Sequence, residues 1–291
     1  MRLFHENKPF FKGNLHTHTT NSDGKMDPQD TIALYKQHGY DFLSITDHRV
    51  RTTDVMEHEG MLVLPGTEMD FALPGQTIHL VGIQVPPSIA DFDRAQGPQA
   101  FISLVNKQGG AAILAHPLWS FNDADTICAL QGLCAAEIYN TASQPPWNPD
   151  RADATGILDY AANRGSLLRT VASDDTHNYN GDECRSATML QADSLTPEGI
   201  ISALKEGAFY ASLGPEFVQV EYDGNTVSVT CSPVRSIFFH TNLPWAPKRC
   251  VQGEGITHGE YRVQHDMGDA YVRVIIEDEN GLRAWANPFK V

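Results

Sequence analysis

Two histidines near the start of the chain are spaced so that both could bind the same ion. His16 and His18 lie two residues apart in a segment that we expect to form a strand. Because successive side chains of a strand point to opposite faces, the two imidazoles share one face. One such pair is weak evidence alone. Further residues of metal-binding type follow in order, each beside an apolar run: Asp23, Asp47, His48, Glu68, His79, His116, Asp174, Asp175 and His177.

Nine of these residues form a candidate ligand set without cysteine: His16, His18, Asp23, His48, Glu68, His79, His116, Asp175 and His177. Imidazole combined with carboxylate suits zinc, manganese or iron better than magnesium or calcium, which prefer oxygen ligands throughout. A single zinc ion takes three or four protein ligands. The set therefore predicts a site for two or three divalent metal ions.

Composition limits the classes of function that remain open. The chain has 291 residues, 41% of them hydrophobic, and a formal net charge of −15. No apolar run reaches the roughly 18 residues of a membrane span, and no basic tract favours nucleic acid or membrane binding. A small anionic substrate is still compatible, because bound cations can dominate the charge of a pocket. Five cysteines without a CxxC pair, and polar residues at 1–12, favour a cytoplasmic location.

Short apolar runs alternate with helix signals from about 14 to 213, which is the pattern of an α/β fold. The clearest helix is 28–38, with Asp27 as its N-terminal cap, Pro28 at its first position and Gly39 at its exit. Several strand-like runs end just before a candidate ligand: 41–46, 61–65, 111–115 and 167–171. Another run, 136–139, ends at Asn140. In (β/α) barrels such strand ends converge on one pocket. His79 does not follow this rule, because it lies near the start of its run at 78–85, and we expect an irregular strand or loop there.

The pattern changes after residue 214 to short β-like runs without helix signals: 216–222, 226–231, 235–240, 260–265, 270–277 and 282–286. Asp-Gly-Asn at 223–225 and Glu-Asn-Gly at 279–281 are typical of hairpin turns. We therefore predict two domains, an α/β barrel domain that carries the candidate metal site at 1–214 and a smaller all-β, sandwich-like domain at 215–291. Trp245 and Trp285 of the second domain are expected to pack in a core rather than to bind carbohydrate.

The ordered motifs resemble the PHP (polymerase and histidinol phosphatase) superfamily of metal-dependent phosphoesterases, over residues 12–213. They are Leu-His-Thr-His at 15–18 with Asp23, Thr-Asp-His at 46–48, Gly-x-Glu at 66–68, His-Pro at 116–117 and Asp-x-His at 175–177. The segment 207–215 also resembles the closing segment of short bacterial members that carry a C-terminal β domain. The resemblance implies a distorted (β/α)7 barrel with a dinuclear or trinuclear metal centre.

Position by position, the resemblance groups the ligands around three ions. His16, His18, Glu68 and Asp175 would hold the first ion, and Glu68 would bridge to a second ion held by His79 and His116. Asp23, His48 and His177 would hold the third, with Asp23 standing where some relatives have histidine. Such a centre supports in-line hydrolysis, because a water between two cations loses a proton readily and attacks phosphorus. The predicted function is hydrolysis of a small phosphorylated metabolite, with a nucleoside monophosphate as one candidate.

Other residues are candidates for proton transfer, substrate binding and support. Asp23, His177 or a metal-bound water could protonate the leaving oxygen, and Asp47 and Asp174 could orient ligands. Arg185 is the first choice for binding an anionic group, followed by Arg49, with Lys25 and Arg51 also near the motifs. Asn140 and Glu137 end a strand and could face the substrate.

Two alternative functions remain open at this stage. The same centre could hydrolyse a non-phosphate ester, a carbamate or an amide, because paired Lewis acids do not fix the electrophile. The scarcity of basic residues near the motifs favours this alternative slightly. The chain could also be a metal-stabilised binding protein whose β domain recognises its partner.

Overall fold

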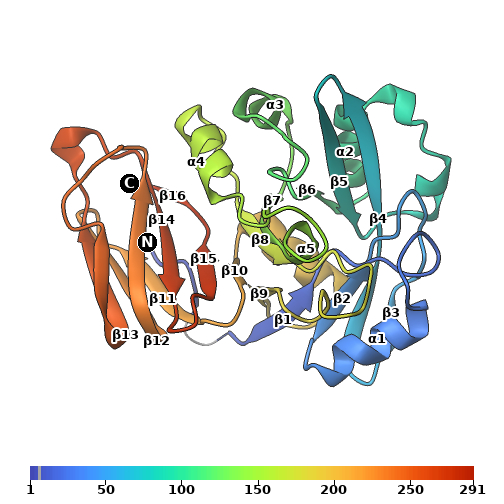
Figure 1. Cartoon of the computed structure of the whole chain (residues 1–291), viewed down its shortest axis with the longest axis horizontal. Helices are drawn as coiled ribbons and strands as arrows, with labels where there is room; N and C mark the ends of the chain where they lie inside the picture. The colour runs from blue at the N-terminus through green and yellow to red at the C-terminus, as the bar shows by residue number, and fades with distance from the viewer. Residues whose placement is uncertain (6–7) are drawn as a thin grey trace.

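The computed structural model describes residues 1–5 and 8–291 (Figure 1). Its five α-helices are α1 (Pro28–Gln37), α2 (Pro98–Lys107), α3 (Ala124–Ala129), α4 (Thr155–Asn163) and α5 (Pro197–Glu206). The strands of the first part are β1 (Phe10–Asn14), β2 (Phe42–Ile45), β3 (Met56–His58), β4 (Met61–Leu73), β5 (Gln76–Ile83), β6 (Ala111–Leu114), β7 (Ala135–Asn140), β8 (Thr170–Ser173), β9 (Ala187–Gln191) and β10 (Phe209–Ser212). The last part contains β11 (Phe217–Tyr222), β12 (Thr226–Thr241), β13 (Cys250–Arg262), β14 (Tyr271–Glu277), β15 (Arg283–Ala286) and β16 (Phe289–Lys290).

Local sequence signals explain why α1 begins where it does. The Asp27 carboxylate accepts hydrogen bonds from the backbone N–H groups of Gln29 at 2.8 Å and Asp30 at 3.1 Å. Pro28 occupies the first helical position, where its missing N–H group costs nothing. The predicted helix is confirmed, and Gly39 follows it with a positive φ of 73°.

The strands of the first part form a mixed sheet. The hydrogen-bonded order runs β9-β1-β2-β4-β5-β6-β7-β8. β5 runs antiparallel to both β4 and β6, whereas β1, β2 and β4 are parallel, as are β6, β7 and β8. The reversal explains the place of His79, because the start of β5 lies level with the end of β6. The backbone N–H of Ala115 accordingly donates to the carbonyl of His79 at 3.0 Å.

A closed (β/α)7 barrel is not confirmed, although the mixed α/β class is. Among the described residues, β8 ends the strand order and has no ladder with β1. The two strands are joined only just beyond their ends, where a single bridge links Thr17 to Thr176. Two backbone hydrogen bonds flank the bridge, from Asp175 to His16 at 2.9 Å and from His18 to Thr176 at 3.1 Å. The junction is therefore formed by candidate ligand residues themselves.

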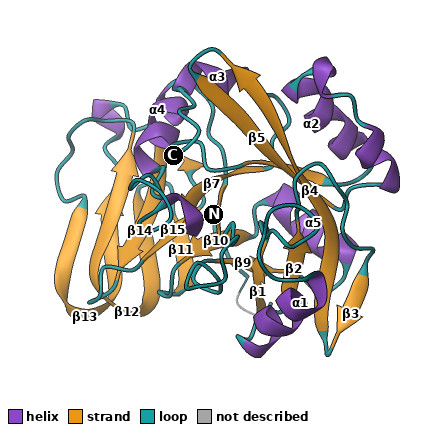
Figure 2. Cartoon of the chain, turned by 45° about the vertical axis from the view of Figure 1, so that its right-hand side comes forward, coloured by secondary structure: helices purple, strands orange, loops and turns teal. Residues whose placement is uncertain are grey.

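The C-terminal strands are hydrogen-bonded to this sheet, since β15 pairs with β10. β12 is one long strand where the sequence predicts two, and it pairs with β11, β13 and β14. A core of its own lies among these strands and includes Phe217, Val229, Phe239 and Val274. Figure 2 shows them on the opposite side of the molecule from the long β4–β5 hairpin. The boundary at 214 stays a prediction.

Two buried side chains of the C-terminal strands contact the first part. Trp285 is fully buried in a core shared with Leu80, Leu114 and Ile138, as expected for a packing residue, whereas Trp245 is exposed. Arg273 is also buried, and its Nε donates to Asp159 Oδ1 at 3.2 Å on α4. Within the described residues, no helix has the length and apolarity that crossing a membrane would require.

Asp159 has two partners, the buried guanidinium of Arg273 and the imidazole of His240. His240 Nδ1 lies 2.9 Å from Asp159 Oδ2. Burial raises the pKa of Asp159, but His240 and Arg273 outweigh it and hold the pKa below its usual value. Removing one partner of a buried ion pair leaves an uncompensated charge.

We therefore expect Asp159→Ala to lower the free energy of unfolding by about 3 kcal/mol, because Arg273 is left without its counter-ion. Urea denaturation followed by circular dichroism measures the change. Asp125→Ala is the matched control, since Asp125 pairs with Arg164 and both side chains are mostly exposed. This control should change stability little, because exposed ion pairs contribute little. Equal losses in the two variants would contradict the prediction.

Candidate metal centre

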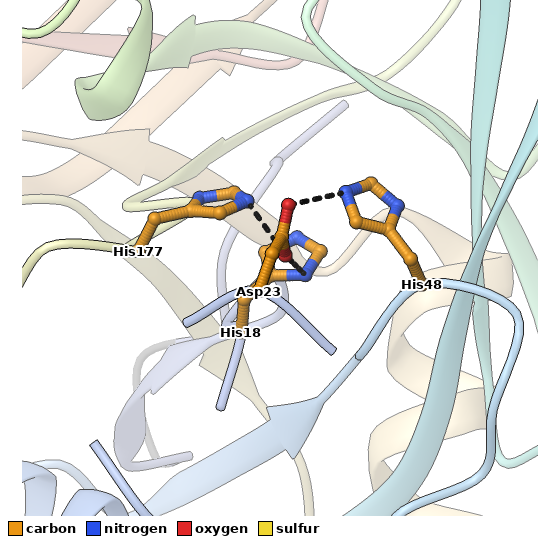
Figure 3. A group of neighbouring side chains, drawn as sticks. All are labelled: His18, Asp23, His48 and His177. Atoms are coloured by element: carbon orange, nitrogen blue, oxygen red, sulfur yellow. Dashed lines mark ion pairs between the residues drawn. The ribbon is translucent and has the colours of Figure 1, made fainter. Parts of the chain in front are cut away.

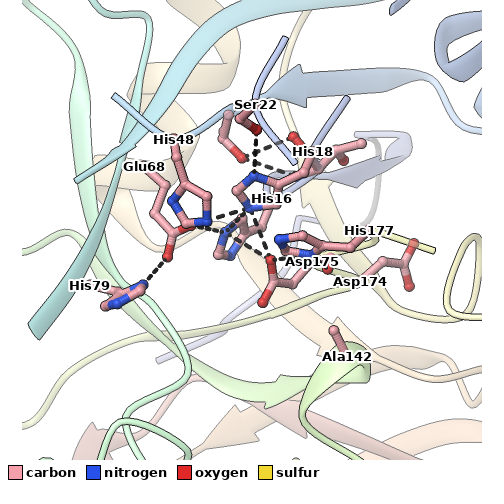
Figure 4. A network of polar contacts seen from close by, with 12 residues as sticks. His16, His18, Ser22, His48, Glu68, His79, Ala142, Asp174, Asp175 and His177 are labelled. Carbon is pink, nitrogen blue, oxygen red and sulfur yellow. Dashed lines mark hydrogen bonds and ion pairs between the residues drawn. The ribbon is translucent and has the colours of Figure 1, made fainter. Parts of the chain in front are cut away.

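The nine predicted ligand residues come together at one end of the sheet. His16 and His18 follow β1, and His48 follows β2. Glu68 lies within β4 and His79 within β5. The remaining ligands follow the ends of other strands: His116 after β6, Asp175 and His177 after β8, and Asp23 in the loop before α1. The clustering results from six different strands that end at, start at or pass this place, and Figure 4 shows several of the side chains that they bring together.

The buried carboxylate of Glu68 lies at the middle of the cluster. Five imidazole nitrogens surround its two oxygens: His16 Nε2 and His18 Nε2 at 3.2 Å and His48 Nδ1 at 3.1 Å from Oε2, and His79 Nδ1 at 2.6 Å and His116 Nε2 at 3.1 Å from Oε1. Glu68 is thereby placed to bridge two positive charges, one on each oxygen.

Asp175 faces the same two leading histidines from the other side. Its Oδ1 lies 3.2 Å from His16 Nε2 and 3.1 Å from His18 Nε2. Asp175 has a positive φ of 54° and His116 one of 26°, conformations that side-chain-bearing residues rarely adopt. Such backbone strain is commonly found where a side chain must be aimed at a functional site.

A more exposed group lies at the rim of the cluster (Figure 3). Asp23 Oδ1 lies 3.4 Å from His177 Nε2 and 3.8 Å from His18 Nδ1, and Asp23 Oδ2 lies 3.7 Å from His48 Nε2. The Asp23 side chain is 58% exposed, whereas that of Glu68 is 1% exposed. The rim group is therefore open to solvent and to a substrate.

Three groups of side chains are close enough together for each to hold an ion. They are His16, His18, Glu68 and Asp175; Glu68, His79 and His116; and His18, Asp23, His48 and His177. These groups coincide with the grouping that the resemblance implies, with His18 added to the third. The geometry thus brings together all nine residues, and their role as metal ligands is taken up under the proposed function.

The electrostatics of the cluster favour bound cations. Burial raises the pKa of Glu68, but His16, His79 and the neighbouring imidazoles outweigh it, so the pKa lies well below its usual value. Burial lowers the pKa of His16, yet Asp175, Glu137 and Glu68 raise it well above its usual value. The buried carboxylates therefore stay ionised and demand positive charge from their surroundings.

The donor atoms themselves fit divalent ions. Asp175 Oδ1 and His48 Nδ1 are buried and make no hydrogen bond within the described chain. Leaving such atoms without a partner is unfavourable. In addition, His16 Nε2 and His18 Nε2 face each other at 3.1 Å. Converging imidazole and carboxylate donors of this kind match a zinc, manganese or iron site, and the unpartnered atoms are where such an ion would be held.

Glu137, on β7, fixes the orientation of His16. Its Oε1 lies 2.8 Å from His16 Nδ1, and its Oε2 accepts from the backbone N–H of His116 at 2.8 Å. Because an ionised carboxylate can only accept, Nδ1 of His16 carries the proton and Nε2 is left free to bind an ion. Asn140 donates to Glu137 Oε2 at 2.8 Å and to Asp175 Oδ2 at 3.2 Å. Asn140 is therefore a buried residue that supports Glu137 and Asp175.

Two further buried carboxylates hold the loops that carry ligands. Asp47 accepts from the backbone and hydroxyl of Thr19 and from Ser22 Oγ, each at 2.7 Å, rather than binding His48. Asp174 accepts from Tyr35 Oη at 2.8 Å and from the backbone of Ser186 at 2.7 Å. Within the described residues, these hydrogen bonds fix loops and not imidazoles, so the predicted role of orienting ligands stays a prediction.

A cavity of about 440 Å³ opens directly over the cluster. Besides the ligands it is lined by Lys25, Trp119, Ala142, Ser143, Trp147, Asn148 and Asn178. Lys25 forms no ion pair within the described residues, and its backbone N–H donates to the carbonyl of His177 at 2.8 Å. The sequence favours packing or pocket lining for the two tryptophans, whereas the two asparagines were not predicted, because no motif surrounds them.

The three residues predicted to bind substrate lie elsewhere. Arg185 lies outside this cavity and lines a separate one of about 350 Å³, with its guanidinium 5.9 Å from the Trp147 ring. Arg49 lines a neighbouring opening of about 450 Å³, where its Nε donates to Asp70 at 2.7 Å. Asn140 is buried beneath the cluster. Of the basic candidates, Lys25 alone lines the main cavity.

Comparisons with known proteins give a structural likeness only. No protein-family model and no curated protein sequence matches the chain. A two-domain protein from Bacteroides vulgatus, described as containing a predicted PHP-like metal-dependent phosphoesterase, is 15% identical, with a TM-score of 0.53. The likeness covers 98% of this chain and 95% of that protein. It therefore extends over both the α/β part and the C-terminal strands.

Two other solved structures align less well. An amidohydrolase from Chromobacterium violaceum aligns with a TM-score of 0.47 and 15% identity, over 68% of this chain and 96% of that one. A protein from Bifidobacterium adolescentis, described as a metal-dependent phosphoesterase, aligns with a TM-score of 0.44 and 17% identity, over 59% and 89%. The shared fold therefore rests on the Bacteroides protein.

The position of Glu137 behind His16 generates a prediction about metal affinity. Glu137→Gln should weaken the binding of Zn²⁺ or Mn²⁺ about 10- to 100-fold, because the amide no longer fixes the proton on Nδ1 of His16. Titration of chelator-stripped protein against a chromophoric competitor measures the affinity. Asp70→Asn is the control, since Asp70 lies on the neighbouring β4 surface but binds Arg49 and Arg94. An unchanged affinity in Glu137→Gln would contradict the assignment.

Proposed function

We propose that the chain is a PHP-type, metal-dependent phosphoesterase that hydrolyses a small phosphorylated metabolite. The observation that carries the proposal is the gathering of six histidines and three carboxylates beneath one open cavity. The fold shared with the Bacteroides protein supports it. A nucleoside monophosphate is the first candidate substrate, because the cavity combines a free cation with two tryptophan side chains.

The residues that would hold the ions are those of the three groups, with Glu68 common to two of them. When bound, two or more divalent ions would polarise a phosphoryl oxygen and lower the pKa of a water molecule toward neutrality. The protein's own contribution is to fix donors before the substrate arrives, through Glu137 behind His16 and Asn140 behind Asp175. Fixed donors need no rearrangement at the moment of reaction.

Substrate binding is assigned first to Lys25. Its ammonium group has no counter-ion within the described residues, and the side chain lines the cavity. Arg49 and Arg185 stay proposals of lower rank, because one is paired with Asp70 and the other lies outside the main cavity. A single free cation suits one anionic group.

The proton for the leaving oxygen is assigned to Asp23 and His177. Both line the cavity, and their Oδ1 and Nε2 atoms lie 3.4 Å apart. They are at the open rim, where a leaving group would exit. Their place in the third group means that ion binding there and proton transfer are alternatives for the same side chains.

The direct test is release of inorganic phosphate by protein loaded with Mn²⁺ or Zn²⁺. We expect turnover of at least one class among nucleoside monophosphates, sugar phosphates and histidinol phosphate, and loss of that turnover after chelation. Glu68→Gln should abolish it, because both ion groups that share Glu68 lose a charge. Asp70→Asn should retain it.

Absence of phosphate release from the whole panel would overturn the proposal. In that case the shortage of cations in the cavity favours the second candidate, hydrolysis of a carboxylic ester, carbamate or amide by the same centre. Turnover of nitrophenyl acetate or a nitroanilide would then identify the reaction. Metal binding without turnover of either panel would instead indicate a binding protein.

Lys25 generates a separate prediction. Lys25→Met should raise KM for a phosphomonoester about tenfold with little change in kcat, because a contact made equally to substrate and transition state is lost. Steady-state kinetics on the best substrate of the panel measures both constants. Arg185→Met is the comparison, and its KM should change less. A larger effect at Arg185 than at Lys25 would reverse the assignment.

A further inference from the structure

The side of the cavity facing the C-terminal strands is formed by residues 141–153, which we call the cavity wall. Its tip carries Trp147 and Asn148, and its first turn carries Ala142 and Ser143, all of which line the cavity. The segment closes on itself, since the backbone N–H of Arg151 donates to the carbonyl of Ser143 at 3.0 Å. The cavity wall is thus a compact loop between β7 and α4.

The tip of the cavity wall is attached to the other side of the cavity. Trp119 Nε1 donates to Asn148 Oδ1 at 3.0 Å, and Trp147 Nε1 donates to Asn180 Oδ1 at 2.7 Å. Trp119 in turn packs edge-on against the His116 ring, with 4.9 Å between ring centroids. The tip is therefore connected through Trp119 to His116 of the ligand cluster beneath it.

The base of the cavity wall is formed by a bridge between Tyr139 and Asp153. Both residues of the bridge contact β15. Trp285 stacks on Tyr139, with 5.8 Å between ring centroids, and Arg283 Nη1 donates to Asp153 Oδ2 at 3.1 Å. Because Arg283 and Trp285 are two residues apart on a strand, they share one face. One face of β15 thus contacts both sides of the base.

Two further hydrogen bonds extend these contacts into the loop and the helix behind it. Tyr139 Oη donates to Gln144 Oε1 at 2.8 Å, next to the tip of the cavity wall. Trp285 Nε1 donates to Thr155 Oγ1 at 3.0 Å, at the start of α4. Trp285 is fully buried, so its contacts are not loosened by solvent.

We propose that the C-terminal strands belong to the substrate-binding apparatus, with Arg283 and Trp285 of β15 acting as positioning residues for the cavity wall. The cavity wall in turn receives the leaving group of the substrate, with Trp147 offering an aromatic surface. Only the kinetic test of this role rests on the proposed hydrolytic function. We expect β15 to affect substrate affinity and to leave the binding of the ions unchanged.

The chain offers a matched pair of variants. Glu277 accepts from Arg283 Nε at 2.7 Å and from Arg235 Nε at 2.9 Å. Arg283→Met and Arg235→Met each remove one of these cations from Glu277, but only Arg283 also contacts Asp153 of the cavity wall. Asp153→Asn removes the same contact from the opposite side.

The kinetic probes are p-nitrophenyl phosphate, which has an aromatic leaving group, and glycerol 2-phosphate, which does not. Arg283→Met and Asp153→Asn should each raise KM for p-nitrophenyl phosphate about fivefold with kcat nearly unchanged. The double variant should be no worse than either single variant, because both remove one contact. KM for glycerol 2-phosphate, metal content and the behaviour of Arg235→Met should stay as in the parent protein.

A second readout needs no activity. Hydrogen–deuterium exchange of peptides covering 141–153 should be faster in Arg283→Met and Asp153→Asn than in Arg235→Met, since local opening speeds amide exchange. The proposed function is decided by the phosphomonoester panel described above, and if the parent protein hydrolyses neither probe, the exchange result alone decides the role of β15. Unchanged exchange in the cavity wall, a fall in kcat at constant KM, or the same change in Arg235→Met would overturn the inference.

Discussion

The buried carboxylate of Glu68 is the constraint on which the rest of the site depends. A charge removed from water must be compensated by partners at close range, and this one is compensated by imidazoles alone. Five of them approach its two oxygens, from four other parts of the chain. Imidazoles can provide this positive charge in two ways. They can bind protons themselves, or they can stay neutral and present lone pairs to a bound cation. The second solution uses every donor in the cluster and requires imidazoles that are not protonated at the donor atom.

The architecture of the sheet follows from bringing those donors together. Parallel strands deliver residues at their carboxyl ends, which accounts for His48 and His116. Glu68 and His79 require a different solution, because they lie inside a long antiparallel hairpin whose two strands pass the site in opposite directions. Within the described residues, β1 and β8 share no ladder and are joined by the backbone of residues 16–18 and 175–176 and by a hydrogen bond from Asp174 to Asn14 Oδ1. The ligand segments therefore complete the sheet at the point where the strands themselves do not pair.

Sequence reasoning was most accurate where chemistry depends on residue type and order. The residues that gather in the cluster and the cap of α1 could be read from the chain, since a histidine or an N-capping aspartate has few equivalent substitutes. Arg185 could not be placed, because the direction of a long side chain in a loop is set by packing against Trp147, which no pattern announces. The division of β12 into two runs was wrong for a related reason. Pro233 breaks the apolar pattern, but the strand pairing shifts register around it and the strand continues.

The metal centre and the cavity wall obey different physical rules, and the fold separates them accordingly. The inner residues of the centre, such as His16 and Asp175, are buried and held by Glu137 and Asn140, so small displacements there would misplace charge. The cavity wall is a partly exposed loop, which gains its rigidity from contacts at its base and tip. A loop supported in this way can vary in sequence without disturbing the ions below it. Supporting its base from β15 lets the C-terminal strands influence which molecules are bound, while the chemistry stays with residues that never contact them.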